Sequence, residues 1–170
     1  DVQFEIQFQK LEEPQADGID EVCFLISTNP GLPLKALGSV ASGGELSRIM
    51  LAIKAVMADK DEVGTLIFDE IDTGISGRTA QKVSEKMALI ARNHQLLCIT
   101  HLAQIAAMAD HHYIIEKKPA YSKTVTNIGL LGEEESIAEL ARILGGAKIT
   151  DTVLESAREM KELAKNTKKY

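Results

Sequence analysis

The sequence has no apolar run long enough to span a membrane, and it does not open with the charged and apolar segments of a secretory signal. Cysteine is scarce, with two in 170 residues, and both Cys23 and Cys98 lie in apolar, strand-like runs. Small secreted domains that depend on disulfides are far richer in cysteine. We therefore expect two buried, inert thiols in a cytoplasmic protein with no membrane partner; a disulfide is the less favoured alternative.

An excess of basic residues is also lacking. The chain carries 19 Lys and Arg against 25 Asp and Glu, a formal net charge of −6. Self-sufficient DNA-binding modules present a basic surface, so this charge argues against one, although it says little about a larger protein that contains the chain. With 45% hydrophobic and 26% charged residues, the composition is that of one globular domain.

The apolar pattern predicts an α/β fold. Alternation over Val2–Phe8 and a second run at Glu21–Ser27 indicate a small antiparallel β layer at the N-terminus. Continuous apolar strands are expected at Thr65–Phe68, Leu96–Thr100 and His112–Glu116. Helical patterns are predicted over residues 46–57, 76–92, 102–109, 133–144 and 150–164. Such strands alternating with helices indicate a parallel sheet covered on both faces.

Two acids follow the first apolar strand, in the run TLIFDE from Thr65 to Glu70. Open α/β sheets bind ligands at the carboxyl ends of their strands. Asp69 suits Mg²⁺, usually held through water, and Glu70 suits orienting and polarising a water that attacks a phosphate. Taken alone, an acidic exit from a strand into solvent explains the same two residues.

A glycine pair precedes a predicted helix in the run ASGGELSR, residues 41–48. Glycines let backbone N–H groups approach an anion, and the helix N-terminus adds partial positive charge. Ser42, Gly43 and Gly44 therefore predict a phosphate-binding turn. The alternative is a capping box of Ser42 and Glu45, which explains those two residues but not the glycines.

A histidine, His101, directly follows the next apolar strand in the run ITH. It can hydrogen-bond a phosphate and respond to its loss, although a histidine at a strand end can also be structural. Together these runs resemble the motifs of ABC-type ATPase heads: SGGE at 42–45 the signature motif, TLIFDE the Walker B strand, and His101 the switch histidine. The resemblance implies a partial P-loop NTPase head using ATP and Mg²⁺, with Glu70 and His101 catalytic and Asp69 at the metal.

The stretch after Glu70 resembles the D-loop, which crosses to the partner head in ABC dimers. Transporters read close to P-T-S-A-L-D there, whereas this chain reads I-D-T-G-I-S over residues 71–76. The resemblance assigns Asp72, Gly74 and Ser76 to this nucleotide-contacting loop. Ser76 in place of the closing aspartate, and Glu45 in place of a glutamine, depart from transporters and favour the chromosome-maintenance and repair branch.

Within that branch, the runs ASGGELSR, FDEIDTGISGRTA and ITHLAQIAAMADHHYIIEK resemble the RecN family, as does STNPG at 27–31. The resemblance covers roughly Glu21 to Ile149. It implies that residues 1–170 are the C-terminal lobe of the ATPase head of a bacterial, nucleoid-associated protein. Such a protein has a coiled-coil arm and acts in recombinational repair of DNA double-strand breaks.

A complete head also needs a P-loop, G-x-x-x-x-G-K-[ST], but the sequence has no Gly-Lys dipeptide and no coiled-coil heptads. In the family the P-loop lobe precedes the arm, so we expect this chain to follow the arm, with Asp1 not the natural start. Asp69, Glu70 and His101 would act on a nucleotide held by the P-loop lobe of their own head. The signature residues 42–45 would contact the γ-phosphate on a second, identical head. ATP would join the heads, hydrolysis would release them, the intact protein would bind DNA, and the chain alone would be inactive.

Alternatives stay open for three features. The other function is a non-hydrolysing, ATP-gated dimerisation module of an SMC-like protein, less favoured because such a clamp does not need Glu70. Asp110, His111 and His112 suggest a metal site, but adjacent residues of a strand point to opposite faces. The basic tail Lys165–Lys169 can contact DNA or simply end a solvated helix.

Overall fold

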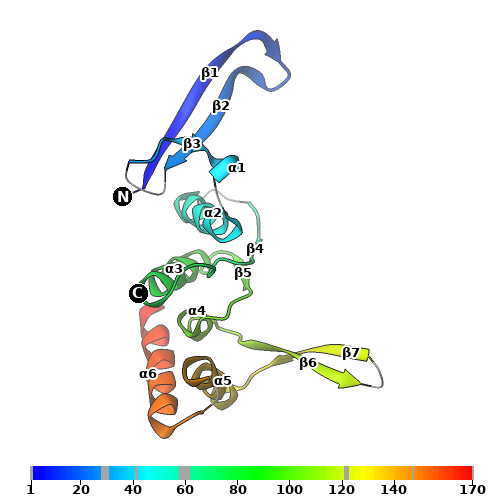
Figure 1. The fold of residues 1–170 in the computed structure, drawn as a ribbon, viewed down its shortest axis with the longest axis vertical. Helices are drawn as coiled ribbons and strands as arrows, with labels where there is room; N and C mark the ends of the chain where they lie inside the picture. Colours follow the sequence, from blue (N-terminus) through cyan, green and yellow to red (C-terminus); the bar gives the residue numbers. More distant parts are fainter. Residues whose placement is uncertain are drawn as a thin grey trace.

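The structure, a computed structural model, describes residues 2–27, 31–40, 42–57, 62–120, 123–146 and 148–169. Its elements form an elongated column from which two β-hairpins project (Figure 1). Residues 28–30 of the STNPG run, and Ala41 before the glycine pair, lie outside the described residues. Among the described residues, no helix is long and apolar enough to cross a membrane.

The N-terminal elements form a long antiparallel hairpin. β1 (Gln3–Gln15) pairs with β2 (Gly18–Ser27), and the short β3 (Lys35–Ala36) pairs with the end of β2. The predicted β layer is confirmed, but both strands are longer than predicted, because the polar residues between the two apolar runs continue the pairing as far as Gln15 and Gly18. A single turn of helix, α1 (Leu37–Val40), then leads toward α2.

Two parallel strands lie at the centre of the column. β4 (Thr65–Phe68) pairs in parallel with β5 (Gln95–Cys98), as predicted. The helices α2 (Gly43–Met57) and α3 (Gly77–Ile90) are also close to their predicted positions. Side chains from these elements and from Ile71 and Ile105 share one apolar core, made of Leu51, Leu66, Phe68, Ile71, Val83, Met87, Ile90 and Ile105.

The parallel sheet is smaller and less covered than the sequence predicted. Phe68 is buried, whereas Ile67 is 70% and Leu97 48% exposed, so the described residues cover only one face of the strand pair. The expected third strand is also wrong as part of this sheet. β6 (Tyr113–Ala120) instead pairs antiparallel with β7 (Lys123–Leu130) in a separate hairpin. An apolar run suits either partner, and antiparallel neighbours need only a short connection.

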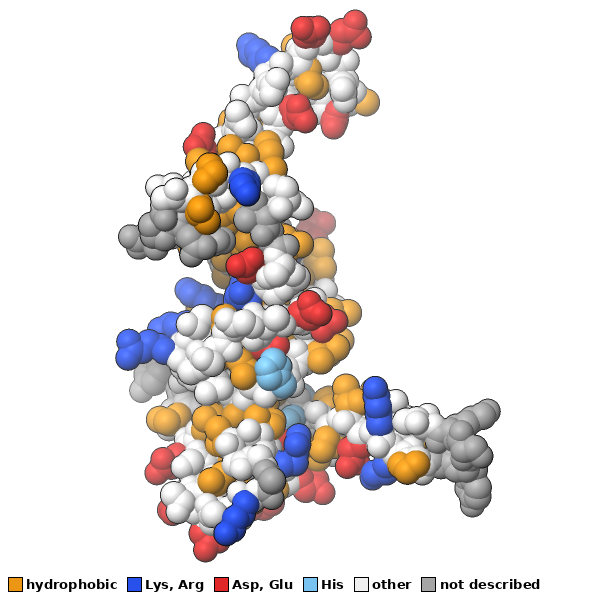
Figure 2. Space-filling view, viewed as in Figure 1, with side chains coloured by type: hydrophobic (Ala, Val, Ile, Leu, Met, Phe, Trp, Pro, Cys, Tyr) orange, Lys and Arg blue, Asp and Glu red, His pale blue; other side chains and the backbone are white. Residues whose placement is uncertain are grey.

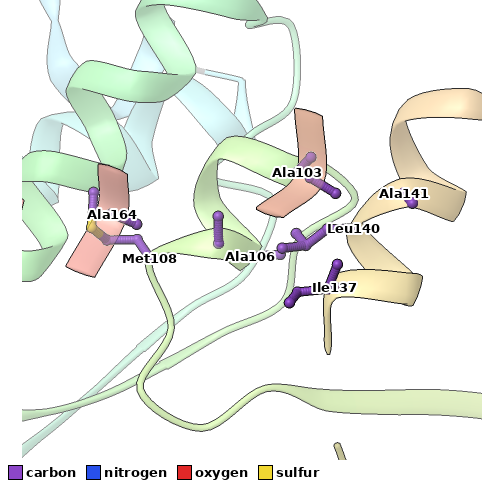
Figure 3. Packing of buried hydrophobic residues seen from close by; sticks show 9 residues of the cluster. Ala103, Ala106, Met108, Ile137, Leu140, Ala141 and Ala164 are labelled. Carbon is purple, nitrogen blue, oxygen red and sulfur yellow. The ribbon is translucent and has the colours of Figure 1, made fainter. Parts of the chain in front are cut away.

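Three helices build a second core at the base of the column. They are α4 (Ala103–Ala107), α5 (Glu133–Gly145) and α6 (Asp151–Thr167), and each was predicted. Figure 3 shows their buried side chains meeting, and the cluster comprises Ala103, Ala106, Ala107, Met108, Ile137, Leu140, Ala141, Ala157 and Ala164. Because most of these side chains are methyl groups, the helices can pack close together.

Candidate functional site

The predicted site residues meet where the carboxyl ends of β4 and β5 face the N-terminus of α2. Asp69 and Glu70 directly follow β4, and His101 lies three residues beyond the end of β5. Parallel pairing of the two strands brings both exits to the same edge of the sheet. The glycine pair reaches that edge from α2, so the structure brings together three motifs that are far apart in the sequence.

Ser42 and Glu45 form the capping box that was the alternative interpretation of this run. The Ser42 backbone N–H and hydroxyl donate to Glu45 Oε2 over 3.1 and 3.3 Å, and the Glu45 N–H donates to Ser42 Oγ over 3.4 Å. The box stabilises the start of α2 at Gly43. It does not require glycine at either of the next two positions, so it is compatible with a further role for the pair.

The glycine pair allows a close contact that the sequence did not reveal. A Cβ on Gly43 would lie 2.5 Å from Glu70 Oε2, and a Cβ on Gly44 would lie 2.7 Å from the Glu70 carbonyl oxygen and 3.0 Å from Thr73 Cβ. The lack of side chains therefore lets the first turn of α2 lie directly on the acidic loop. The Glu70 carboxylate sits where the partial positive charge of a helix N-terminus stabilises an anion.

Two polar side chains of α2 hold the same loop by its backbone. Ser47 Oγ donates to the Asp69 carbonyl over 2.9 Å. Arg48 Nη1 donates to the carbonyls of Ile71 (3.0 Å) and Thr73 (2.8 Å). No role for Ser47 was predicted; the available signal was its spacing of four residues from Gly43, which puts both on one helix face.

Glu70 has an unusual backbone conformation for a side chain of its size. Its φ is +57°, and it is the one non-glycine residue with positive φ among those described. The Glu70 N–H donates to Asp69 Oδ1 over 2.9 Å, which ties the two acids together. Left-handed backbone costs an L-residue of this kind about 1–2 kcal/mol, so the neighbouring contacts must hold it there.

Asp72 and His101 form a second polar cluster beside the acidic pair. The Asp72 carboxylate is buried, and its Oδ2 accepts from Thr100 Oγ1 at 2.6 Å and from the His101 backbone N–H at 2.8 Å. His101 Nδ1 lies 3.0 Å from the same oxygen, while the His101 side chain is 71% exposed. Thr100 Oγ1 in turn accepts from the Leu102 N–H over 3.1 Å.

The other predicted D-loop residues have different surroundings. Gly74 and Ser76 are exposed, with φ of +75° at Gly74. Ser76 is the N-cap residue of α3, and its side chain makes no capping hydrogen bond. Of the three, only Asp72 is turned into the protein, which the sequence did not predict.

The cysteine beside this site is chemically quiet. Burial, reinforced by the charges of Asp72 and Asp69, raises the pKa of the Cys98 thiol to about 12. A thiol with such a pKa stays protonated and is a poor nucleophile near neutral pH. Cys23 and Cys98 are both free, as predicted, but each is half-buried, so the predicted full burial is wrong.

The donor set suits a magnesium ion that is shared with phosphates. Among the described residues, no group of three or more His, Cys, Asp or Glu side chains is arranged to hold a metal by itself. Mg²⁺ needs no such cage, because it usually takes one or two carboxylates, several waters and phosphate oxygens. The exposed Asp69 fits that role. His112, by contrast, is engaged with Ser136, with 2.8 Å between Nδ1 and Oγ.

Comparison with known proteins identifies several with similar sequences. No protein-family model matches the sequence. The chain is 45% identical over 169 residues to the DNA repair protein RecN of Halalkalibacterium halodurans, which covers 97% of the chain and 30% of that protein. It is 49% identical over 151 residues to RecN of Bacillus subtilis, covering 89% of the chain and 26% of that protein. RecN of Deinococcus radiodurans is 44% identical over 156 residues, or 92% of the chain.

A solved structure has a similar fold. It comes from work on the structural biochemistry of ATP-driven dimerization and DNA-stimulated activation of SMC ATPases. The match has a TM-score of 0.51 at 21% identity and covers 84% of this chain and 81% of the other. At this identity the likeness shows the fold alone, and it confirms the predicted mixed α/β fold class. The RecN proteins match nearly the whole sequence, and the chain spans about 30% of the length of these relatives.

Proposed function

We propose that the chain is the C-terminal lobe of an ATP-hydrolysing head in a RecN-like DNA-repair protein. The observation that carries this proposal is the meeting of the Asp69–Glu70 pair, the Gly43–Gly44 turn and His101 at one edge of the sheet. The proteins that match the sequence at 45–49% identity are named for DNA repair, which supports the same function.

Each residue has a separate task in this proposal. Bound Mg²⁺, with Asp69 among its ligands, would offset the charge of the phosphates. Glu70 orients the attacking water and polarises its O–H bond. His101 donates a hydrogen bond to the phosphate that is cleaved.

The phosphate-binding turn completes the site from a second head. In this proposal the Glu70 carboxylate, which lies against Gly43 in the structure, turns to the nucleotide of its own head. Ser42, Gly43 and Gly44, held in place by Glu45, then offer the N-terminus of α2 to the γ-phosphate on the opposing head. Gly74 and Ser76 lie on the exposed loop that faces the same partner. ATP would then join two heads and hydrolysis would separate them, while DNA binding belongs to the intact protein.

Apolar side chains exposed on the strands support the proposal that a second lobe covers them. Ile67 and Leu97 are exposed on the bare face of β4 and β5, and Phe4, Ile6 and Phe8 are exposed on β1. Figure 2 shows hydrophobic side chains at the surface along much of the column. Apolar surface of this extent usually marks an interface. We assign the bare face of β4 and β5 to the P-loop lobe of the same head.

A complementation assay tests the proposal. ATP hydrolysis is measured for the chain alone, for a separately made P-loop segment of the same protein, and for their mixture, with and without DNA. We expect turnover only in the mixture, and we expect Glu70→Gln to abolish it. Glu155→Gln, the same change on the exposed surface of α6, is the control and should leave turnover unchanged.

Two results would count against the proposal. Turnover by the chain alone would refute the assignment of a lobe that needs its partner. A stable, nucleotide-binding complex of the two segments without turnover would favour the alternative, a non-hydrolysing ATP-gated dimerisation module.

A further inference from the structure

The proposed reaction assigns no role to Asp72. Asp72 is 3% exposed, yet it lies next to the exposed His101 and close to Asp69 and Glu70 in the sequence. A buried carboxylate is costly unless several hydrogen bonds or an opposite charge compensate for it. Here the compensation comes from Thr100, from the His101 backbone and from the His101 ring, all at Oδ2.

These contacts restrain His101 at two points. The backbone N–H is 2.8 Å from Asp72 Oδ2, and the ring Nδ1 is 3.0 Å from the same atom. Thr100 adds a third restraint, because its hydroxyl donates to Asp72 and accepts from the Leu102 N–H just before α4. The imidazole is therefore held on a short, hydrogen-bonded turn although most of its surface is exposed.

The contact with Nδ1 also determines which ring nitrogen carries a proton. An unprotonated Nδ1 would place its lone pair 3.0 Å from a carboxylate oxygen, and two acceptors at that distance repel each other, so the contact favours a proton on Nδ1. The hydrogen bond made by one ring nitrogen fixes the tautomer and directs the other nitrogen. Nε2 is then on the exposed side of the ring, and it can donate to a phosphate only when both ring nitrogens carry a proton.

We propose that Asp72 is a positioning residue that holds the Nδ1–H side of the His101 ring, so that Nε2 is directed outward to the phosphate being cleaved. This inference rests on the proposed function, in which His101 contacts that phosphate. In the transporter pattern a threonine takes the place of Asp72, and a neutral hydroxyl cannot supply the same charge. The role is distinct from a direct contact with nucleotide, because the carboxylate is buried.

NMR of the chain itself tests the positioning. Long-range ¹H–¹⁵N spectra of the imidazole rings, recorded well above the usual histidine pKa of about 6.5, identify the tautomer of His101, with His101→Gln providing the assignment. We expect Nδ1–H in the wild type and at least about a twofold rise of the Nε2–H fraction in Asp72→Asn, because an amide oxygen attracts the proton less than a carboxylate does. Asp20→Asn, the same change on the exposed hairpin, should leave the ring unchanged.

The wild-type spectrum decides the question even if Asp72→Asn does not fold. Nε2–H in the wild type would overturn the positioning role, as would an unchanged tautomer in a folded Asp72→Asn chain.

Kinetics of the intact protein test the consequence for turnover. Asp72→Asn should lower kcat for ATP about tenfold, the rate equivalent of one hydrogen bond to a charged group, with KM nearly unchanged. The double variant with His101→Gln should be no slower than His101→Gln alone, because Asp72 acts through that ring. Additive losses would overturn the inference. Absence of turnover in the wild type would overturn the proposed function as well, whereas an Nε2–H ring beside normal turnover would overturn the positioning role alone.

Discussion

Gly43 and Gly44 are adjacent and identical, yet they face different neighbours. The Cβ position of Gly43 is close to the end of a flexible side chain, Glu70 Oε2, while that of Gly44 is close to the Glu70 carbonyl and to Thr73 Cβ. A side-chain end can move aside at little cost, but a main-chain carbonyl moves only with the loop around it. The two glycines therefore differ in what they tolerate.

Alanine substitutions should separate these two roles. Gly44→Ala should lower the free energy of unfolding by about 1–3 kcal/mol, the usual cost of overpacking. Gly43→Ala should stay within about 1 kcal/mol of the wild type, because alanine also favours the helix. Urea unfolding of both variants measures the difference, and equal losses would contradict it.

The strained backbone of Glu70 leads to a second prediction. Glycine adopts a φ of +57° without the penalty that a side chain incurs. The free energy of unfolding of Glu70→Gly should therefore be about 1 kcal/mol higher than that of the isosteric control Glu70→Gln, although both lack the carboxylate. Thermal unfolding distinguishes them, and a less stable glycine variant would show that the strain is not relieved.

The motif residues themselves were predictable from the sequence, because each follows or begins a strongly patterned element. Asp69, Glu70 and His101 lie just beyond the two parallel strands, as expected. What the sequence did not indicate is contact at the level of atoms. The placement of Gly44 against a main-chain carbonyl depends on how two distant segments approach each other, and local pattern contains no such information.

At the scale of elements, helices were predicted better than strand partners. The helical patterns repeat over several turns, so α2, α3, α5 and α6 lie close to their expected ranges. An apolar strand, by contrast, does not specify its neighbour. β6 was expected in the same parallel sheet as β4 and β5, and it instead pairs with β7, which is joined to it by a short connection.

The junction of β6, α5 and α6 contains a titrating group. Burial, together with the nearby charge of Lys161, lowers the pKa of His112, while Glu139 opposes the shift. Because the folded state holds this ring with a lowered pKa, the unfolded state binds more protons at mildly acidic pH. Its contribution to stability is present above the unfolded pKa of about 6.5 and is lost as pH falls through the lower folded value.

We therefore expect His112→Gln to flatten the pH dependence of stability. The free energy of unfolding of the wild type should fall more steeply than that of His112→Gln between roughly pH 7 and 5. Urea titrations at several pH values provide the comparison. Parallel curves would mean that His112 does not couple to folding.

At the scale of the whole molecule, the chain divides into a well-covered base and an incompletely covered upper part. The helices α4, α5 and α6 enclose their own core, as Figure 3 shows. The strand pair β4–β5 and both hairpins leave apolar side chains in solvent. The sequence predicted cover on both faces of the sheet because β4 and β5 are apolar throughout, and that pattern is what a buried sheet in a larger assembly requires.

Charge placed on the bare face should affect assembly and not folding. Ile67→Lys should change the chain's own stability by less than about 0.5 kcal/mol, as at other exposed sites. It should weaken binding to the P-loop segment at least about tenfold, since burying an isoleucine stabilises by roughly 1.5–3 kcal/mol. Leu163→Lys on α6, a residue 67% exposed, is the matched control. Calorimetric titration measures both, and equal effects of the two variants would contradict the assignment of the face.

The lack of room for a Cβ at position 44 also limits how the sequence of the protein can evolve. Every replacement of Gly44 adds a Cβ, and that atom would contact a main-chain carbonyl oxygen. Every residue has this oxygen, so no substitution elsewhere can remove it. Val56 lies on the same helix but is 87% exposed, so its substitution should have little effect on the fold. Position 44 does not tolerate a side chain in this way. We therefore expect related proteins to keep glycine there, however far the rest of α2 diverges.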